Sequence, residues 1–191
     1  MMPEKPVEEI IADLLSEDGV LRQSAESSLK DVSAETVLPE LSVLLRSPEK
    51  CIRKRGMELF CCMGRDAVPS LALLLNDKEW TIRYRAAEAL GIIGGDAACD
   101  LLLNSLQDIR DHVRYMAAKG LGLSLRTETA GAVAALLNDE NEFVRASSAR
   151  ALGRMNLAAY APCIEEALQQ EKYDKTRAAM SEALTILGRD R

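Results

Sequence analysis

The sequence predicts an all-α protein, built as an α-solenoid of about six stacked two-helix repeats. Three observations favour this fold class. An arginine recurs at intervals of 31, 30, 31, 31 and 32 residues, apolar residues surround it at helical spacing, and no run of alternating β-branched residues indicates a strand. The arginines are Arg22, Arg53, Arg83, Arg114, Arg145 and Arg177.

Each repeat is predicted to begin with an apolar helix, such as 41–45 or 71–75, and to turn at polar pairs such as Asn76-Asp77. The arginine lies in the second helix, between apolar residues that share one helical face and small residues that allow neighbouring helices to approach closely. Glycines such as Gly64 and Gly94 end that helix. We expect one domain, 1–191, with repeats at 6–32, 33–64, 66–95, 96–126, 127–156 and 157–188.

Composition excludes a membrane protein. The chain has 191 residues and a net charge of −6, and 48% of its residues are hydrophobic. The longest stretches without a charged residue have ten residues, such as 67–76, whereas a membrane-spanning helix needs about 20 apolar residues. The N-terminal residues turn acidic where a signal peptide would be apolar. We therefore predict a cytoplasmic protein that does not contact a membrane.

No constellation of residues predicts catalysis. The five cysteines form no C-x-x-C pair, and the single histidine, His112, follows an aspartate at a variable position of the repeat, where we expect it to be exposed. The nucleotide-binding loop, the nucleophile elbow and the zinc-binding helix motif are all missing from the sequence. We predict no enzyme activity, no metal site and no cofactor.

Two stretches, LLLNDKEWTIRYRAAEALGIIGGDAA and ALLNDENEFVRASSARALGRM, resemble HEAT repeats of the short type also called phycobilisome-lyase HEAT-like repeats. The period of 31 residues is shorter than the roughly 40 of ordinary HEAT repeats, which favours this compact type. The resemblance covers all six repeats and implies a right-handed superhelical stack of the armadillo-like kind. It is unspecific for function.

Acidic residues lie six positions before four of the arginines, and in HEAT repeats similar positions form a ladder between adjacent repeats. Ser16 and Ser47 replace the acid in the first two repeats, which predicts weaker ties there. Because a planar guanidinium can bond a carboxylate and carbonyl groups together, we interpret the row as structural. The predicted ladder consists of Asp77, Arg83, Asp108, Arg114, Asp139, Arg145, Glu171 and Arg177.

The residues one, two and five positions after each arginine are predicted to face outward, and the HEAT resemblance implies that they line a concave groove. Five of them are basic and three acidic, although the chain as a whole is acidic. A merely solvated helix face is the alternative. The candidate binding residues are Lys54, Arg55, Tyr84, Arg85, Tyr115, Met116, Lys119 and Arg150.

Two further features stand out. Trp80 occupies a position that is polar or glycine in the other repeats, where it either anchors a partner at the edge of the groove or packs against the next repeat. The last predicted helix carries apolar residues and no polar capping helix follows it in this sequence, which favours self-association or docking through the C-terminal repeat.

These observations predict a non-catalytic scaffold or adaptor that binds a partner protein, most simply an acidic segment, in the groove. Two alternatives stay open: a HEAT-like subunit of a bilin lyase that attaches chromophores, and nucleic-acid binding by the basic face. Net negative charge argues against nucleic acid. The sequence predicts that replacing Tyr84 and Arg85 by alanine abolishes partner capture.

Overall fold

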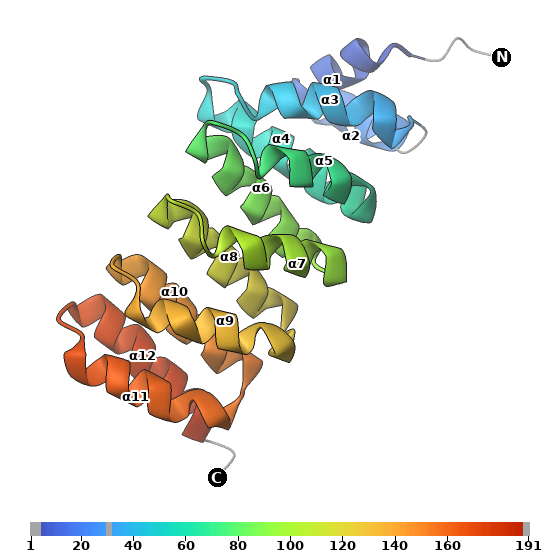
Figure 1. The fold of residues 1–191 in the computed structure, drawn as a ribbon. Coiled ribbons are helices and arrows are strands. Elements are labelled where there is room, and N and C mark those ends of the chain that lie inside the picture. Colours follow the sequence, from blue (N-terminus) through green and yellow to red (C-terminus); the bar gives the residue numbers. More distant parts are fainter. Residues whose placement is uncertain (1–4, 30–31, 189–191) are drawn as a thin grey trace. The chain divides into compact units, whose positions relative to one another are not determined.

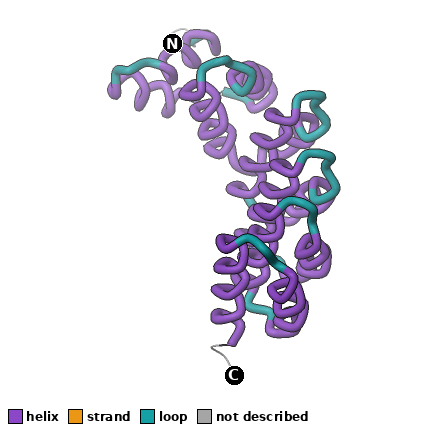
Figure 2. Tube along the Cα trace, turned by 90° about the vertical axis from the view of Figure 1, so that its left-hand side faces the viewer, coloured by secondary structure: helices purple, strands orange, loops and turns teal. Residues whose placement is uncertain are grey.

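The computed structural model describes residues 5–29 and 32–188, and every regular element in these ranges is helical (Figure 2). The predicted all-α class is confirmed. The helices fall into two compact units, Met1–Leu74 and Leu75–Arg191, called unit 1 and unit 2 here. The boundary between the units lies inside the predicted repeat 66–95, so the expectation of one continuous domain stays a prediction.

Unit 1 contains two complete helix pairs and the first helix of the third. Leu14, Leu41 and Phe60 are among the fully buried side chains of its core. The helices are α1 (Val7–Leu15), α2 (Gly19–Leu29), α3 (Ala34–Leu44), α4 (Lys50–Met63) and α5 (Val68–Leu74), with a 3-10 turn, η1 (Gly64–Ala67), before α5.

Unit 2 contains seven α-helices and three 3-10 turns, and its described helices alternate along the chain in the predicted order (Figure 1). The helices are α6 (Trp80–Ile93), α7 (Asp96–Ser105), α8 (Asp111–Ser124), α9 (Ala130–Ala135), α10 (Glu142–Met155), α11 (Ala161–Gln170) and α12 (Asp174–Gly188). The turns are η2 (Thr127–Thr129), η3 (Leu136–Asn138) and η4 (Ala158–Tyr160).

Within unit 2, the arginine-bearing helices form one layer, in which α8 packs between α6 and α10, and α10 between α8 and α12. Helices α7, α9 and α11 form the other layer. Buried apolar residues such as Ile82, Val113 and Leu152 lie in the core.

Small residues bring neighbouring backbones of the arginine-bearing layer into direct contact. A Cβ atom added to Gly91 of α6 would lie 2.7 Å from the Cα atom of Gly120 in α8. One added to Gly122 would lie 2.6 Å from the Cβ atom of Ala151 in α10. Since real Cβ atoms do not approach so closely, these positions need glycine. Because the backbones lie so close together, helix faces that would otherwise meet solvent are buried.

Candidate functional site

Arginines and carboxylates connect consecutive repeats of unit 2. Arg83 of α6 donates from Nε and Nη2 to the two carboxylate oxygens of Asp108, at 2.7 and 2.8 Å, and this residue lies 25 positions further along the chain. Arg114 binds Asp139 and Arg145 binds Glu171 in the same bidentate way. The remaining nitrogen, Nη1, donates to the carbonyl group six residues before each arginine.

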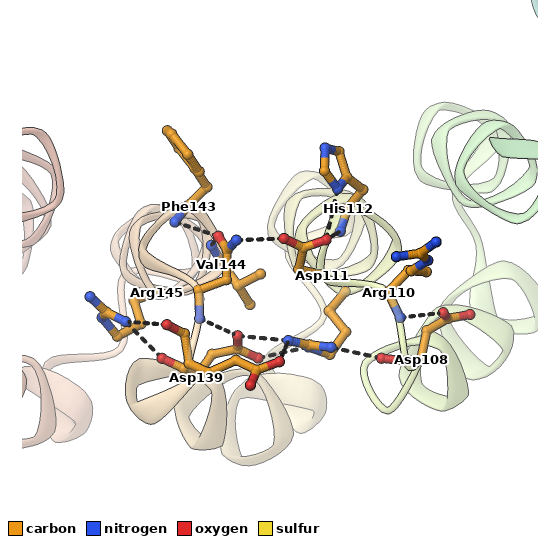
Figure 3. A network of polar contacts seen from close by, with 11 residues as sticks. Asp108, Arg110, Asp111, His112, Asp139, Phe143, Val144 and Arg145 are labelled. Carbon is orange, nitrogen blue, oxygen red and sulfur yellow. Dashed lines mark hydrogen bonds and ion pairs between the residues drawn. The ribbon is translucent and has the colours of Figure 1, made fainter. Parts of the chain in front are cut away.

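The carboxylates also hold the turn that precedes each arginine-bearing helix. Asp108 accepts a hydrogen bond from the backbone N–H two residues later, that of Arg110 (Figure 3). Asp139 and Glu171 each accept the equivalent hydrogen bond in their own turns. Burial alone would raise the pKa of Asp108, but hydrogen bonds from Arg83 and from the backbone of Arg110 lower it. Arg83, Arg114 and Arg145 thus each bind a carboxylate of the next turn, and their purely structural role stays a prediction.

The other three recurring arginines donate hydrogen bonds to main-chain carbonyl groups. Arg22 and Arg53 donate to the carbonyl oxygens of Ser16 and Ser47, where the acid of the other repeats is replaced by a hydroxyl group. Arg177 donates to the carbonyl oxygens of Leu168 and Glu171, while Asp77 accepts from the backbone of Glu79.

Carboxylates neutralise the predicted basic residues of unit 1. Lys54 forms an ion pair with Glu58 at 3.6 Å, and Arg55 pairs with both Glu26 and Glu58. A cavity of about 560 Å³ in this unit has the carboxylates of Glu26 and Asp66 among its described lining residues and no lysine or arginine. Unit 1 therefore offers little net positive charge to an acidic partner.

On α6, Tyr84 and Arg85 form a small local cluster. Arg85 donates to Glu88 at 2.6 Å, and its guanidinium carbon lies 5.2 Å from the centre of the Tyr84 ring. Burial raises the pKa of Tyr84, and the nearby carboxylate of Glu88 raises it further. The charge of Arg85 is thus largely balanced within its own helix.

Among the described residues of the predicted groove, the cations without a carboxylate partner lie on α8 and α10. Tyr115, Lys119, Arg150 and Arg154 line a shallow cavity of about 80 Å³ between the two helices, together with Ser147 and Ala151. Lys119, Arg150 and Arg154 are exposed, and none of them forms an ion pair with a carboxylate in residues 5–29 or 32–188. We call this cluster of Tyr115 and the three cations the basic face.

The prediction that Met116 faces the groove is wrong. Its side chain is only 3% exposed, because the position two residues after the arginine lies on the flank of α8 that meets a neighbouring helix. The equivalent Ser147 of α10 is also buried and donates to the carbonyl oxygen of Tyr115 at 3.1 Å. In this layer, the part of each helix surface that faces solvent is narrower than the periodicity of a single helix indicates.

A second cavity opens between the starts of α8 and α10. It measures about 270 Å³ and is lined by Asp111, His112, Tyr115, Asn141 and Phe143, mostly through apolar atoms. The rings of His112 and Phe143 project to the same side of the helices (Figure 3). Because Tyr115 lines both cavities, this aromatic pocket lies beside the basic face.

Polar groups at the base of the pocket bind each other. Asp111 accepts from the side-chain amide of Asn141 at 2.5 Å and contacts Nδ1 of His112 at 2.7 Å. The Asn141 side-chain oxygen in turn caps α10 by accepting from the backbone N–H of Phe143 and Val144. Although burial would raise the pKa of Asp111, hydrogen bonds from the side chain and backbone of His112 lower it.

Trp80 packs against the next repeat. Its ring centre lies 4.9 Å from that of His112, and the guanidinium group of Arg110 lies over the Trp80 ring at 6.0 Å. The ring is half-buried. Of the two roles left open for Trp80, packing against the following repeat is the one seen in the structure, and a role as partner anchor stays a prediction.

A family model for HEAT repeats matches residues 38–115 and 107–185 of the chain. The protein belongs to the HEAT-repeat family. In unit 2, the pairs of Arg83, Arg114 and Arg145 with turn carboxylates thus connect consecutive HEAT repeats. No curated protein matches the sequence.

Solved structures share the HEAT or armadillo-like fold at low identity. The complex of CpcE and CpcF of phycocyanin lyase from Nostoc sp. PCC7120 includes a chain with 19% identity and a TM-score of 0.69, over 76% of this chain and 96% of that one. A designed armadillo repeat protein in complex with the peptide (KR)4 has 15% identity and a TM-score of 0.55, over 96% and 100%. Human deoxyhypusine hydroxylase in complex with glycerol has 19% identity and a TM-score of 0.52, over 96% and 85%.

Sequence reasoning did not single out Phe143, Asn141 or Arg154, and it treated His112 as a surface residue. His112 is indeed exposed, but it forms a wall of the aromatic pocket. A usable signal was present, since the only tryptophan, the only histidine and one of two phenylalanines start the arginine-bearing helices of three successive HEAT repeats.

Three further predictions concern the last helix, metal binding and the membrane. Most of the apolar residues of α12, including Met180, Ala183 and Leu187, are buried inside unit 2, so self-association through the C-terminal HEAT repeat stays a prediction. In the described part of the chain, no cluster of three or more histidine, cysteine, aspartate or glutamate side chains could hold a metal ion. None of the described helices is long and apolar enough to cross a membrane.

Proposed function

We propose that this HEAT-repeat protein is a non-catalytic scaffold and that the basic face of α8 and α10 holds an acidic segment of a partner protein. The observation that carries the proposal is the cluster of Lys119, Arg150 and Arg154 around Tyr115. Elsewhere on the predicted groove, Lys54, Arg55 and Arg85 are paired with carboxylates of their own unit.

Charge complementarity supports an acidic partner. Three cations without a carboxylate partner among the described residues lie on two adjacent helices, and they create a local positive potential on a chain of net charge −6. Tyrosine and arginine are also the residue types that most often dominate protein interfaces. The carboxylate pairing of Arg85 means that removing Tyr84 and Arg85 should weaken binding less than removing the cations of α8 and α10.

The test uses a fluorescently labelled peptide of ten residues, rich in aspartate and glutamate, and measures its binding by fluorescence anisotropy. Lys119→Glu with Arg150→Glu should weaken binding at least tenfold. Lys78→Glu with Lys175→Glu makes the same change in net charge at exposed positions away from the basic face, and should leave affinity within about twofold. Equal losses in both double variants would show nonspecific attraction only.

Nucleic acid is tested in parallel with a labelled single-stranded DNA of twenty nucleotides. Phosphate binding weakens steeply with added salt, because counterions are released, whereas an interface with an aromatic component weakens less. DNA binding that is tighter than peptide binding at about 150 mM salt, the ionic strength at which the screening length is about 8 Å, would overturn the proposal.

A further inference from the structure

The aromatic pocket beside the basic face has the features of a binding site for one side chain of a partner. Its volume of about 270 Å³ is lined by the rings of His112, Tyr115 and Phe143. Phe143 is 57% exposed although it is a large apolar residue, and no described helix covers it. An exposed aromatic side chain at the rim of an apolar cavity is typical of a recognition surface.

The chemistry of the lining selects the occupant. Asp111 and Asn141 satisfy each other and the helix cap, so the base of the pocket has few free hydrogen-bonding groups to offer a polar side chain. A cation is disfavoured too, because the Asp111 carboxylate is already bound by His112 and Asn141. The three cations of the basic face also surround Tyr115, a residue that lines both cavities. An uncharged apolar or aromatic side chain fits what remains.

We infer that the aromatic pocket receives an aromatic or large aliphatic side chain of the same acidic segment that binds the basic face, so that the partner motif has an apolar anchor next to acidic residues. This inference rests on the proposed function. Phe143 and Arg150 are seven residues apart on α10, about 10 Å along the helix. An extended peptide covers that distance in about three residues, which sets the spacing between anchor and acids.

The experiment uses labelled peptides with four acidic residues and one variable anchor, Phe, Ala or Lys, three residues away, synthesised in both chain orders. The Phe peptide should bind the full-length protein about tenfold more tightly than the Ala peptide, as burial of one aromatic side chain predicts. Phe143→Ala should remove this advantage and leave the affinity of the Ala peptide unchanged. Phe143→Leu, which keeps an apolar wall, should retain most of it.

Trp80 supplies an independent readout, because it is the only tryptophan and its ring packs on His112, a wall of the pocket. The Phe peptide should change the emission of Trp80 and the Ala peptide should not. Circular dichroism of Phe143→Ala should match wild type, since the replaced side chain is largely exposed.

The outcomes separate the two proposals. If Phe and Ala peptides bind equally and both are weakened by Lys119→Glu with Arg150→Glu, the pocket inference is wrong and the proposed function stands. Tighter binding of the Lys peptide would make the pocket a cation site and would also overturn the inference. If no acidic peptide binds, both proposals fail.

Discussion

Replacing Glu171 by glutamine removes the carboxylate that connects α10 to the turn before α12. The Glu171 side chain is 1% exposed and accepts from Arg145 at 2.7 and 2.9 Å. It also accepts from the backbone N–H groups of Lys172 and Tyr173. Glutamine has nearly the same shape, but it carries no charge and turns an N–H group toward a guanidinium that needs an acceptor.

The expected magnitude follows from the pKa of Glu171. The hydrogen bond from Arg145 is the main cause that lowers this pKa from 4.5 to about 2, against the opposing effect of burial. This lowered pKa corresponds to about 3 kcal/mol in favour of the ionised form in the folded state. We therefore expect Glu171→Gln to lower the stability of the α10–α12 interface by about 3 kcal/mol at pH 7.

The pH dependence fixes the sign of the effect. Because the pKa is depressed on folding, the contribution of Glu171 is complete above the unfolded-state value near 4.5 and is lost as the pH falls toward 2. The difference between wild type and Glu171→Gln should shrink to about 1 kcal/mol at pH 3.

Native-state hydrogen exchange of the α12 amides measures this difference locally, which matters because a repeat array can lose one interface before the rest unfolds. Glu166→Gln, an exposed carboxylate on α11, is the matched control and should change little. A destabilisation below about 1 kcal/mol at pH 7, or one that is as large at pH 3 as at pH 7, would refute the reasoning.

Two other predictions concern stability. Ser47→Asp places a carboxylate 25 residues after Arg22, which is the spacing of the Arg83 and Arg114 pairs. It should raise the urea midpoint of unfolding by an amount that corresponds to about 1 kcal/mol. A midpoint no higher than that of Ser47→Ala would contradict this. Gly122→Ala forces a Cβ atom against Ala151 of α10 and should lower the thermal midpoint, at a cost of about 1–3 kcal/mol. Gly131→Ala, where the nearest atom is 3.5 Å away, is its control and should leave the midpoint unchanged or higher.

The fold could be predicted from the sequence because one helix pattern recurs six times, and the family match confirms it. The width of the face that each helix buries could not be predicted from the sequence. Met116 and Ser147 occupy outward positions if each helix is considered alone, yet both are buried. Contacts such as that of Gly122 with Ala151 draw the helices so close that their flanks are covered, and small residues give no hydrophobic signal of such burial.

The site was only partly predictable for a related reason. Tyr115, Lys119 and Arg150 follow from the period of a single helix, and the structure places all three around one cavity. The aromatic pocket forms instead from the starts of two helices about 30 residues apart, and the bond between Asp111 and Asn141 joins them. Pairing of Arg85 with Glu88 also depends on side-chain geometry that a charge count does not contain.

The carboxylates that bind Arg83, Arg114 and Arg145 show how repeats of unequal length keep the same ion pair. Asp108 and Asp139 lie 25 residues after their arginines, whereas 26 residues separate Arg145 from its partner, Glu171. The repeat with the additional residue carries the acid with one more methylene group, and both N–O distances of the pair are preserved. In this chain, exchanging aspartate for glutamate therefore compensates for one additional residue between the two partners, so a repeat can lengthen by one residue without losing its connection to the next.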